Sequence, residues 1–209
     1  MVYYNSHMPL KKNSLFTYVA LLRGINVGGN NIIPMKALQA TFVKMGFSGV
    51  RTYIQSGNVI FQSPLLDARK LEKTIEQVLS KKYDYEARVV IRSLEEMVNI
   101  VKNIPKNWFT DKDKKLNVLF LRHTIDSKKI LDDLHPKEKI ETVIYQPGVL
   151  FWSANTSDLT RTSMVKLSSQ KVYKEMTVRN LNTTLKIFEL MKTTSNKSEE
   201  QREMSILVR

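Results

Sequence analysis

One order of elements occurs twice along the chain, and this repetition constrains the fold more than any other feature of the sequence. The segment YIQSGNVIFQS at 53–63 returns as IYQPGVLFWS at 144–153, with one residue fewer at the turn. The segment VVIRS-LEEM at 89–97 has the same form as TVRN-LNTT at 177–184. The repetition predicts an α+β fold of two ferredoxin-like (βαββαβ) halves, related by internal duplication.

Local patterns place the elements within each half. Apolar residues at offsets 0, 3, 7 and 10 from Met35 form one helical stripe, and Ser93 with Glu96 forms a capping-box pattern. In the first half we expect a strand at 18–23, a helix at 34–45, a hairpin at 51–63, a helix after Ser63-Pro64, a strand at 87–92 and a helix at 93–101. In the second half we expect a strand at 117–122, a helix at 127–134, a hairpin at 141–154, a helix at 164–176, a short strand at 177–179 and a helix at 181–191.

These elements divide the chain into four parts. Residues 1–14 are interpreted as a leader that is disordered or a tag, and the N-terminal ferredoxin-like half covers 15–107. A polar linker lies near 108–115, the C-terminal ferredoxin-like half covers 114–192, and 193–209 is predicted to be a loosely held polar tail.

The predicted central strands are continuously apolar. The runs at 18–22 and 118–121 do not alternate with polar residues, which is typical of sheets covered on both faces. Helices can cover one face, and the second half or a partner subunit can cover the other. An open ferredoxin-like sheet is the usual platform for RNA, so this pattern disfavours that function.

The chain is strongly basic, with a net charge of +13 from 33 Lys plus Arg against 20 Asp plus Glu. This charge attracts nucleic acid, phosphates or anionic surfaces. The lysines are scattered in small groups, which is typical of solvated faces, and no RNA-recognition aromatic octapeptide is present. Nucleic acid is therefore a possible partner that the sequence does not favour.

Several other classes of function lack their signals. The 209 residues include no cysteine, which excludes disulfides and thiolate chemistry and fits a cytoplasmic protein. No apolar run approaches the roughly 18 residues of a membrane span, so no membrane partner is expected. The three histidines have no metal-site spacing and no catalytic motif is recognisable. We predict no metal and no cofactor, and leave an enzymatic activity and the oligomeric state open.

The glycine-rich loop in YVALLRGINVGGNN, at 18–31, is the first candidate site. It lacks the Gly-Lys-Ser/Thr ending of a P-loop and the G-x-G-x-x-G spacing of a dinucleotide site. It can still form an anion nest next to Arg23. Alternatively, the connection needs glycine at positive φ and Asn side chains that bond their own backbone. Its counterpart in the second half, 122–127, has no glycine. The candidate ligand-binding residues of this loop are Arg23, Gly24, Asn26, Gly28, Gly29 and Asn30.

Three further groups of polar residues are candidates for the same small anionic ligand. Turn chemistry is the alternative for the first group and helix capping for the others. Two helix starts that carry arginine could bind a phosphate or carboxylate bidentately, or pair with structural carboxylates. We expect the first β–α loop and the first hairpin turn to lie at opposite ends of the sheet, so the other half would have to bridge them. The candidates are Gln55, Ser56 and Asn58, then Arg161 and Ser163, then Arg179, Asn180, Asn182 and Thr183.

The blocks YVALLRGINVGGNN, IPMKAL, RTYIQSGNVIFQS and TVRNLNTTLKI together resemble the signature blocks of DUF1697, a bacterial family of uncharacterised proteins. The resemblance covers roughly 16–191. It implies an α+β fold of two related halves and no established activity, substrate or cofactor. Family members tend to carry an aromatic residue where this chain has Leu181, so a stacking role at that position is not expected here.

Three functions therefore remain open: binding of a small anionic ligand at the glycine-rich loop, association with nucleic acid, and a structural or interaction module without a ligand. The observation that would best distinguish them is whether the glycine-rich loop and the segment 179–183 line a single cleft.

Overall fold

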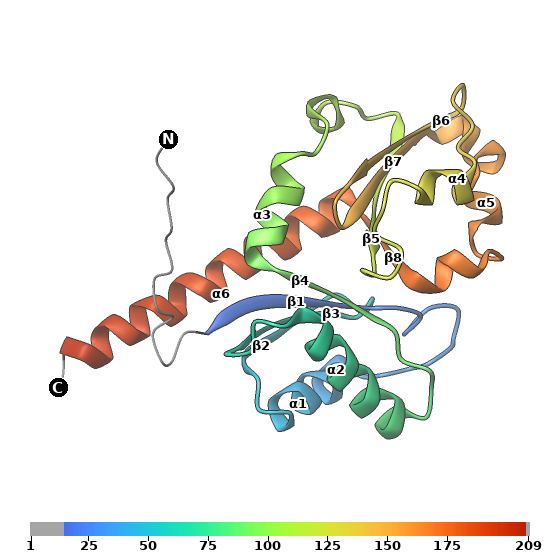
Figure 1. Ribbon diagram of the computed structural model, residues 1–209. Helices are drawn as coiled ribbons and strands as arrows, with labels where there is room; N and C mark the ends of the chain where they lie inside the picture. Colours follow the sequence, from blue (N-terminus) through green and yellow to red (C-terminus); the bar gives the residue numbers. More distant parts are fainter. Residues whose placement is uncertain (1–14, 208–209) are drawn as a thin grey trace, which may run out of the picture.

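The computed structural model describes residues 15–207, with side chains to Lys197, and has an α+β fold with two four-stranded antiparallel sheets (Figure 1). The leader expected at 1–14 lies outside the described residues. The strands are β1 (Phe16–Leu22), β2 (Ser48–Tyr53), β3 (Asn58–Ser63), β4 (Val89–Ser93), β5 (Lys114–Leu121), β6 (Glu141–Gln146), β7 (Val149–Asn155) and β8 (Met176–Asn180). The helices are α1 (Met35–Lys44), α2 (Ala68–Tyr83), α3 (Leu94–Lys102), α4 (Ile130–Leu134), α5 (Met164–Leu167) and α6 (Leu181–Leu207), with short 3-10 turns η1 (Lys106–Phe109), η2 (Thr156–Arg161) and η3 (Lys171–Glu175).

The two sheets have the same strand order. The first is ordered β2-β3-β1-β4 and the second β6-β7-β5-β8. Their registers also correspond, because Val19 of β1 pairs with Arg92 of β4 and Val118 of β5 pairs with Arg179 of β8. Positions in the two halves can therefore be matched one to one across these strands.

Both faces of each sheet are covered, as the continuous apolar strands predicted. Helices α1 and α2 cover the outer face of the first sheet, and α4 and α5 cover the outer face of the second. Between the sheets lie α3 and α6, whose Met97 and Ile187 pack in one core with Val19 and Val118 (Figure 1). No open sheet face is left among the described residues.

The predicted starts of several helices agree with the structure. The Ser93 hydroxyl accepts from the Glu96 N–H at 3.1 Å, and the Glu96 carboxylate accepts from the Ser93 N–H at 2.7 Å. This confirms the capping box that starts α3. The helix expected after Ser63-Pro64 begins at Ala68, with Asp67 as its N-cap.

The continuous helix expected at 164–176 is wrong. The chain forms α5, leaves it at Ser168, and forms η3 only from Lys171. The Ser169 hydroxyl donates to the Lys166 carbonyl at 2.7 Å. Serine side chains that bond the backbone in this way compete with the helix ladder, and the helix ends.

The last helix is longer than expected. We expected its end at Met191 and a loosely held tail from 193, but α6 continues through Leu207. Thr194 is buried, and its carbonyl accepts from Gln62 of β3 at 3.4 Å. Contact between α6 and the first sheet therefore continues past the expected end at Met191. No helix in the described part of the chain combines the length and apolar character that a membrane span requires.

Candidate functional site

The glycine-rich loop folds back on itself. Its backbone has positive φ at five positions: Gly24, Asn26, Gly28, Gly29 and Asn31. The Asn26 amide donates to the Ile33 and Gln55 carbonyls and accepts from the Ile33 N–H, and the Asn31 amide donates to the Gly24 carbonyl. The Asn30 N–H donates to the Val27 carbonyl at 3.1 Å. The loop thus uses its glycines and asparagines for its own conformation.

The loop and the first hairpin turn lie at the same end of the sheet, so the expectation that they lie at opposite ends is wrong. β1 and β3 are antiparallel, which places the end of β1 beside the start of β3. The Leu22 N–H donates to the Gly57 carbonyl at 2.8 Å, and the Asn26 amide reaches Gln55 at 2.9 Å. The two segments contact each other directly and need no bridge from the second half.

Arg179 joins the second half to this end of the first sheet. Its side chain is 7% exposed, and all five of its N–H groups have acceptors within 2.5–2.9 Å. Burial lowers the pKa of Arg179 to about 10. Because no donor is left over, this arginine holds the two halves together and has no free hydrogen bond for an anion. The acceptors are Asn58 Oδ1, Thr177 Oγ1 and the carbonyls of Leu22, Ser56 and Val178.

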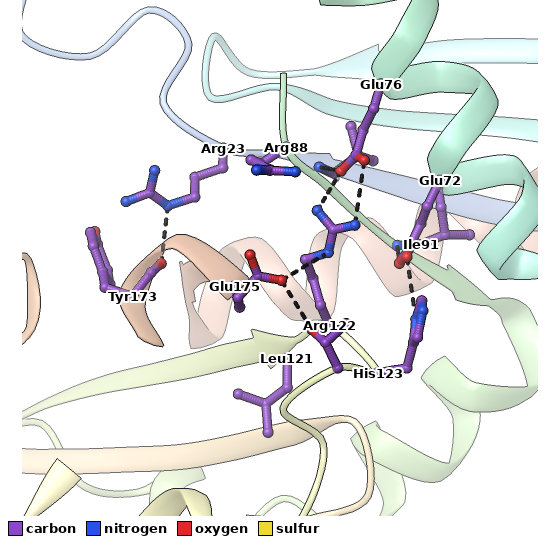
Figure 2. Close-up of polar contacts among 12 residues, drawn as sticks. Arg23, Glu72, Glu76, Arg88, Ile91, Leu121, Arg122, His123, Tyr173 and Glu175 are labelled. Atoms are coloured by element: carbon purple, nitrogen blue, oxygen red, sulfur yellow. Dashed lines mark hydrogen bonds and ion pairs between the residues drawn. The ribbon is translucent and has the colours of Figure 1, made fainter. Parts of the chain in front are cut away.

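Three other predicted site residues, Arg23, Asn180 and Asn182, have different surroundings. The Arg23 guanidinium donates to the Tyr173 carbonyl at 3.1 Å and lies over the Tyr173 ring at 4.5 Å (Figure 2). Asn180 caps α6 by accepting from the Thr183 N–H at 2.7 Å, as capping predicts, and Asn182 is exposed.

Arg161 and Ser163 do not join this group. Arg161 pairs with Asp158 at 3.1 Å, and the Ser163 N–H donates to Glu141 at 2.8 Å. Both contacts lie within the second half.

A second arginine, Arg92, occupies the position that matches Arg179 in the register of the two sheets. It is 5% exposed and reaches in the opposite direction, from the first half into the second. Its Nη2 donates to the Leu121 carbonyl and, at 2.8 Å, to the Gly148 carbonyl. Leu121 ends β5 as Leu22 ends β1, and Gly148 lies in the second hairpin turn. The two arginines therefore make reciprocal contacts between the halves.

Arg92 differs from Arg179 in having unused donors. Beyond the two bonds of Nη2, its Nη1 makes one bond, to the Ile91 carbonyl at 2.7 Å, and its Nε has no hydrogen-bond partner among the described residues. The registers explain the difference. Arg179 bonds the side chains of Asn58 and Thr177. At the matching positions around Arg92 the chain has Val149 in place of Asn58 and Val90 in place of Thr177, and valine side chains cannot accept a hydrogen bond.

A cleft of about 350 Å³ lies at Arg92, between α3 and the second hairpin turn. Ligand pockets typically have volumes of about 300–1,000 Å³. A wider hollow of about 630 Å³ beside the start of β1 has no buried unpartnered polar atom in its lining. The cleft is lined by Arg92, Glu96, Asn99, Ile100, Asn103, Asp126, Gln146, Pro147 and Gly148.

A cluster of charged side chains also lies at the contact between the halves (Figure 2). Arg122, which matches Arg23 in register, donates to both carboxylate oxygens of Glu76 at 2.6 and 3.3 Å and lies 3.4 Å from Glu175. Glu72 is 2% exposed, accepts from the Ile91 N–H at 3.0 Å, and lies 3.3 Å from His123 Nδ1. The pairs Arg122–Glu76 and His123–Glu72 make the cluster an ionic contact between α2 and the loop after β5. Its hydrogen bonding is incomplete, because Glu72 Oε2 and Arg122 Nε have no hydrogen-bond partner among the described residues.

Glu72→Gln is expected to stabilise the protein at neutral pH and to leave it nearly unchanged at acidic pH. Burial raises the pKa of Glu72, so the folded protein keeps this proton to higher pH than the unfolded chain. The associated stability is present below the unfolded pKa and is lost as the pH rises through the folded pKa. Glutamine keeps the acceptor for Ile91 and removes the buried charge. Urea unfolding across the acidic to neutral range measures this, and a difference that does not grow with pH would contradict it.

Arg92 was missed because sequence reasoning selected only one of two matching motifs. The strand ends IRS at 91–93 and VRN at 178–180 have the same form, yet only Arg179 was chosen as a candidate. Treating the two arginines as equivalent would have identified both. The sequence also carries a signal for the unused donors of Arg92: Val90 and Val149 stand where the other half has Thr177 and Asn58.

Comparison with known proteins agrees with the fold. The sequence model of DUF1697, described as a protein of unknown function, matches residues 15–151. The solved structure of conserved bacterial protein SP0830 from Streptococcus pneumoniae is similar, with 28% sequence identity and a TM-score of 0.76, over 85% of this chain and 99% of that one. The search of curated proteins returned no match.

Proposed function

Because the chain belongs to the DUF1697 family of proteins of unknown function, we propose from its own geometry that it binds a small polar ligand in the cleft at Arg92. The observation that carries this proposal is the pair of unused donors on a buried guanidinium. An unsatisfied buried donor costs about 1–3 kcal/mol, and a ligand oxygen that accepts from it recovers part of that cost. Arg179, with every donor used, is the matched case in the same molecule.

The proposal keeps the predicted ligand chemistry and changes its location. A phosphate, carboxylate or carbonyl oxygen can accept from a guanidinium. The glycine-rich loop is the weaker place for such a group because the Asn26 and Asn31 side chains already bond the backbone. Arg23 bonds Tyr173 through Nε and is only half-buried, so solvent can accept from its other donors. The matching loop of the second half, which has no glycine, instead contributes Asp126 to the cleft.

Nucleic-acid association is the weaker alternative. It is supported by the net charge of +13. It would need a surface other than the sheets, because α1, α2, α4 and α5 cover their outer faces and α3 and α6 lie between them. No particular contact favours it.

We also infer that the two halves, 15–107 and 114–192, are ferredoxin-like units that arose by duplication. The inference is supported by their equal strand order and by the reciprocal arginine contacts. On this view the ancestral unit formed a symmetric dimer of two identical copies. The arginine at the end of the last strand of each copy contacted the other copy in the same way. Divergence at the positions of Asn58 and Thr177 then left Arg92 with unused donors.

The test measures the Arg92 Nε–H proton by NMR while the full chain is titrated with acetate, inorganic phosphate and acetamide. We expect a saturable shift of the Arg92 signal with at least one probe, and no shift of the Arg179 Nε–H signal, because that group already donates to Asn58. An Arg92 signal that stays unchanged with all three probes would overturn the proposal.

Filling the cleft provides the matched pair of variants. Asn99→Trp places a large side chain in the cleft, and we expect it to weaken binding by more than about tenfold, which corresponds to about 1.4 kcal/mol. Lys186→Trp is the control, since Lys186 has the same place in α6 as Asn99 in α3: each is the sixth residue of its helix. Equal effects of the two variants would argue against this cleft.

A further inference from the structure

The cleft at Arg92 contains two carboxylates with unused oxygens. Asp126 Oδ1 accepts from the Gly148 N–H at 2.8 Å and from the Tyr145 hydroxyl at 3.0 Å. Glu96 Oε2 accepts from the Ser93 N–H at 2.7 Å. Neither Asp126 Oδ2 nor Glu96 Oε1 makes a hydrogen bond within the described part of the chain. The lining therefore combines free donors on Arg92 with free acceptors on both carboxylates.

The balance of charge decides which ligands suit this lining. One guanidinium faces two carboxylates, so the charged side chains sum to about −1. A simple anion that bonds Arg92 would be repelled by Asp126 and Glu96, and a simple cation would leave the buried Arg92 donors unsatisfied. A ligand with one group of each sign satisfies both sets at once.

We propose that the ligand is a small zwitterion whose carboxylate accepts from Arg92 and whose ammonium donates to Asp126 and Glu96. This inference rests on the proposed function and names its ligand class, that of a free α-amino acid. Arg92 is 5% exposed and lines the cleft, so its charge is fixed in place by the fold. Ile100 and Pro147 supply an apolar part of the lining, against which an aliphatic side chain of the ligand can pack.

The test compares three probes of similar size at equal ionic strength: L-alanine, propionate and ethylamine. Propionate lacks the ammonium of L-alanine and ethylamine lacks its carboxylate. We expect L-alanine to bind at least about tenfold more tightly than either, the loss typical of removing one charged partner from a polar contact. The readouts are the Kd and the shift of the Arg92 Nε–H signal.

Two variants change the charge of the cleft and keep its hydrogen bonds. Glu96→Gln preserves the capping box, which accepts either residue at that position, and Asp126→Asn keeps an oxygen for the Gly148 N–H. We expect each variant to weaken binding of L-alanine and to strengthen binding of propionate. Glu95→Gln is the control, because the adjacent Glu95 is exposed and is not part of the cleft lining.

The outcomes separate the two proposals. Propionate binding as tightly as L-alanine, with a shift at Arg92, would overturn the zwitterion and leave the proposed function standing. Ethylamine binding as tightly as L-alanine would overturn the role of Arg92 as the carboxylate partner. An Arg92 signal that responds to none of these probes, nor to acetate, phosphate or acetamide, would overturn both proposals.

Discussion

Arg179→Met is expected to destabilise the protein by about 3–5 kcal/mol, because it removes several hydrogen bonds from a charged donor, each of which contributes about 1.5–3 kcal/mol. Five acceptors on both halves lose their donor at once. Three of them lie in the first half, namely the carbonyl of Leu22 at the end of β1, the carbonyl of Ser56 in the hairpin turn and the side chain of Asn58. Methionine also removes the desolvation cost of burying the guanidinium, the same burial that lowers the pKa of Arg179 to about 10. The unsatisfied acceptors outweigh this gain because there are several of them, each costing about 1–3 kcal/mol.

Urea unfolding at neutral pH measures the effect. Arg161→Met is the control, since Arg161 is exposed and its partners in the described part of the chain are Asp158 and, through its carbonyl, Lys137. It should change the free energy of unfolding by less than about 0.5 kcal/mol. Arg179→Lys should recover only a part of the loss, because an ammonium has three donors and no planar fork. Similar midpoints for Arg179→Met and Arg161→Met would show that the contacts between the halves do not depend on this arginine.

Gly57→Ala is expected to cost about 2–5 kcal/mol, from about 1–2 kcal/mol of left-handed backbone strain and about 1–3 kcal/mol of overpacking. Gly57 has φ +71°, and a Cβ there would lie 2.8 Å from the Cβ of Leu22 and 2.8 Å from the Cδ1 of Ile25. Both neighbours are in the closed end of the first sheet and are almost fully buried. The clash therefore cannot be relieved by turning an exposed side chain.

Gly24→Ala separates strain from overpacking. Gly24 has nearly the same φ, +69°, but nothing within 4 Å of a Cβ, so we expect a loss of only about 1–2 kcal/mol. Thermal and urea unfolding of both variants give the comparison. A loss for Gly24→Ala as large as that for Gly57→Ala would mean that strain alone accounts for both.

Much of the fold could be predicted from local signals. The two hairpins, the capping box at Ser93 and the two-sided burial of the central strands agree with the structure. Each of these depends on neighbouring residues or on a short pattern. Helix boundaries were less predictable, since α5 ends where serines compete for backbone and α6 continues because it packs on the first sheet.

The candidate site was less predictable than the fold. The sequence singled out Arg179, and the structure shows that three of its five donors reach the first half and the other two bond its own strand, β8. Arg92 has the same place in the other half and unused donors. A sequence gives the residue type, but whether a donor is used depends on which carbonyls the partner half brings within about 3 Å.

The sequence by itself determined the order of elements, their repetition and the apolar faces of the strands, because these follow from side-chain periodicity and turn chemistry within a few residues. Only the tertiary structure decided that the first loop and hairpin turn share one end, that the arginines exchange contacts between halves, and that the cleft lies at Arg92. The reason is that each of these features joins residues from distant parts of the chain. Arg179 and Leu22 are 157 positions apart, and no local pattern records what lies opposite a side chain at that separation.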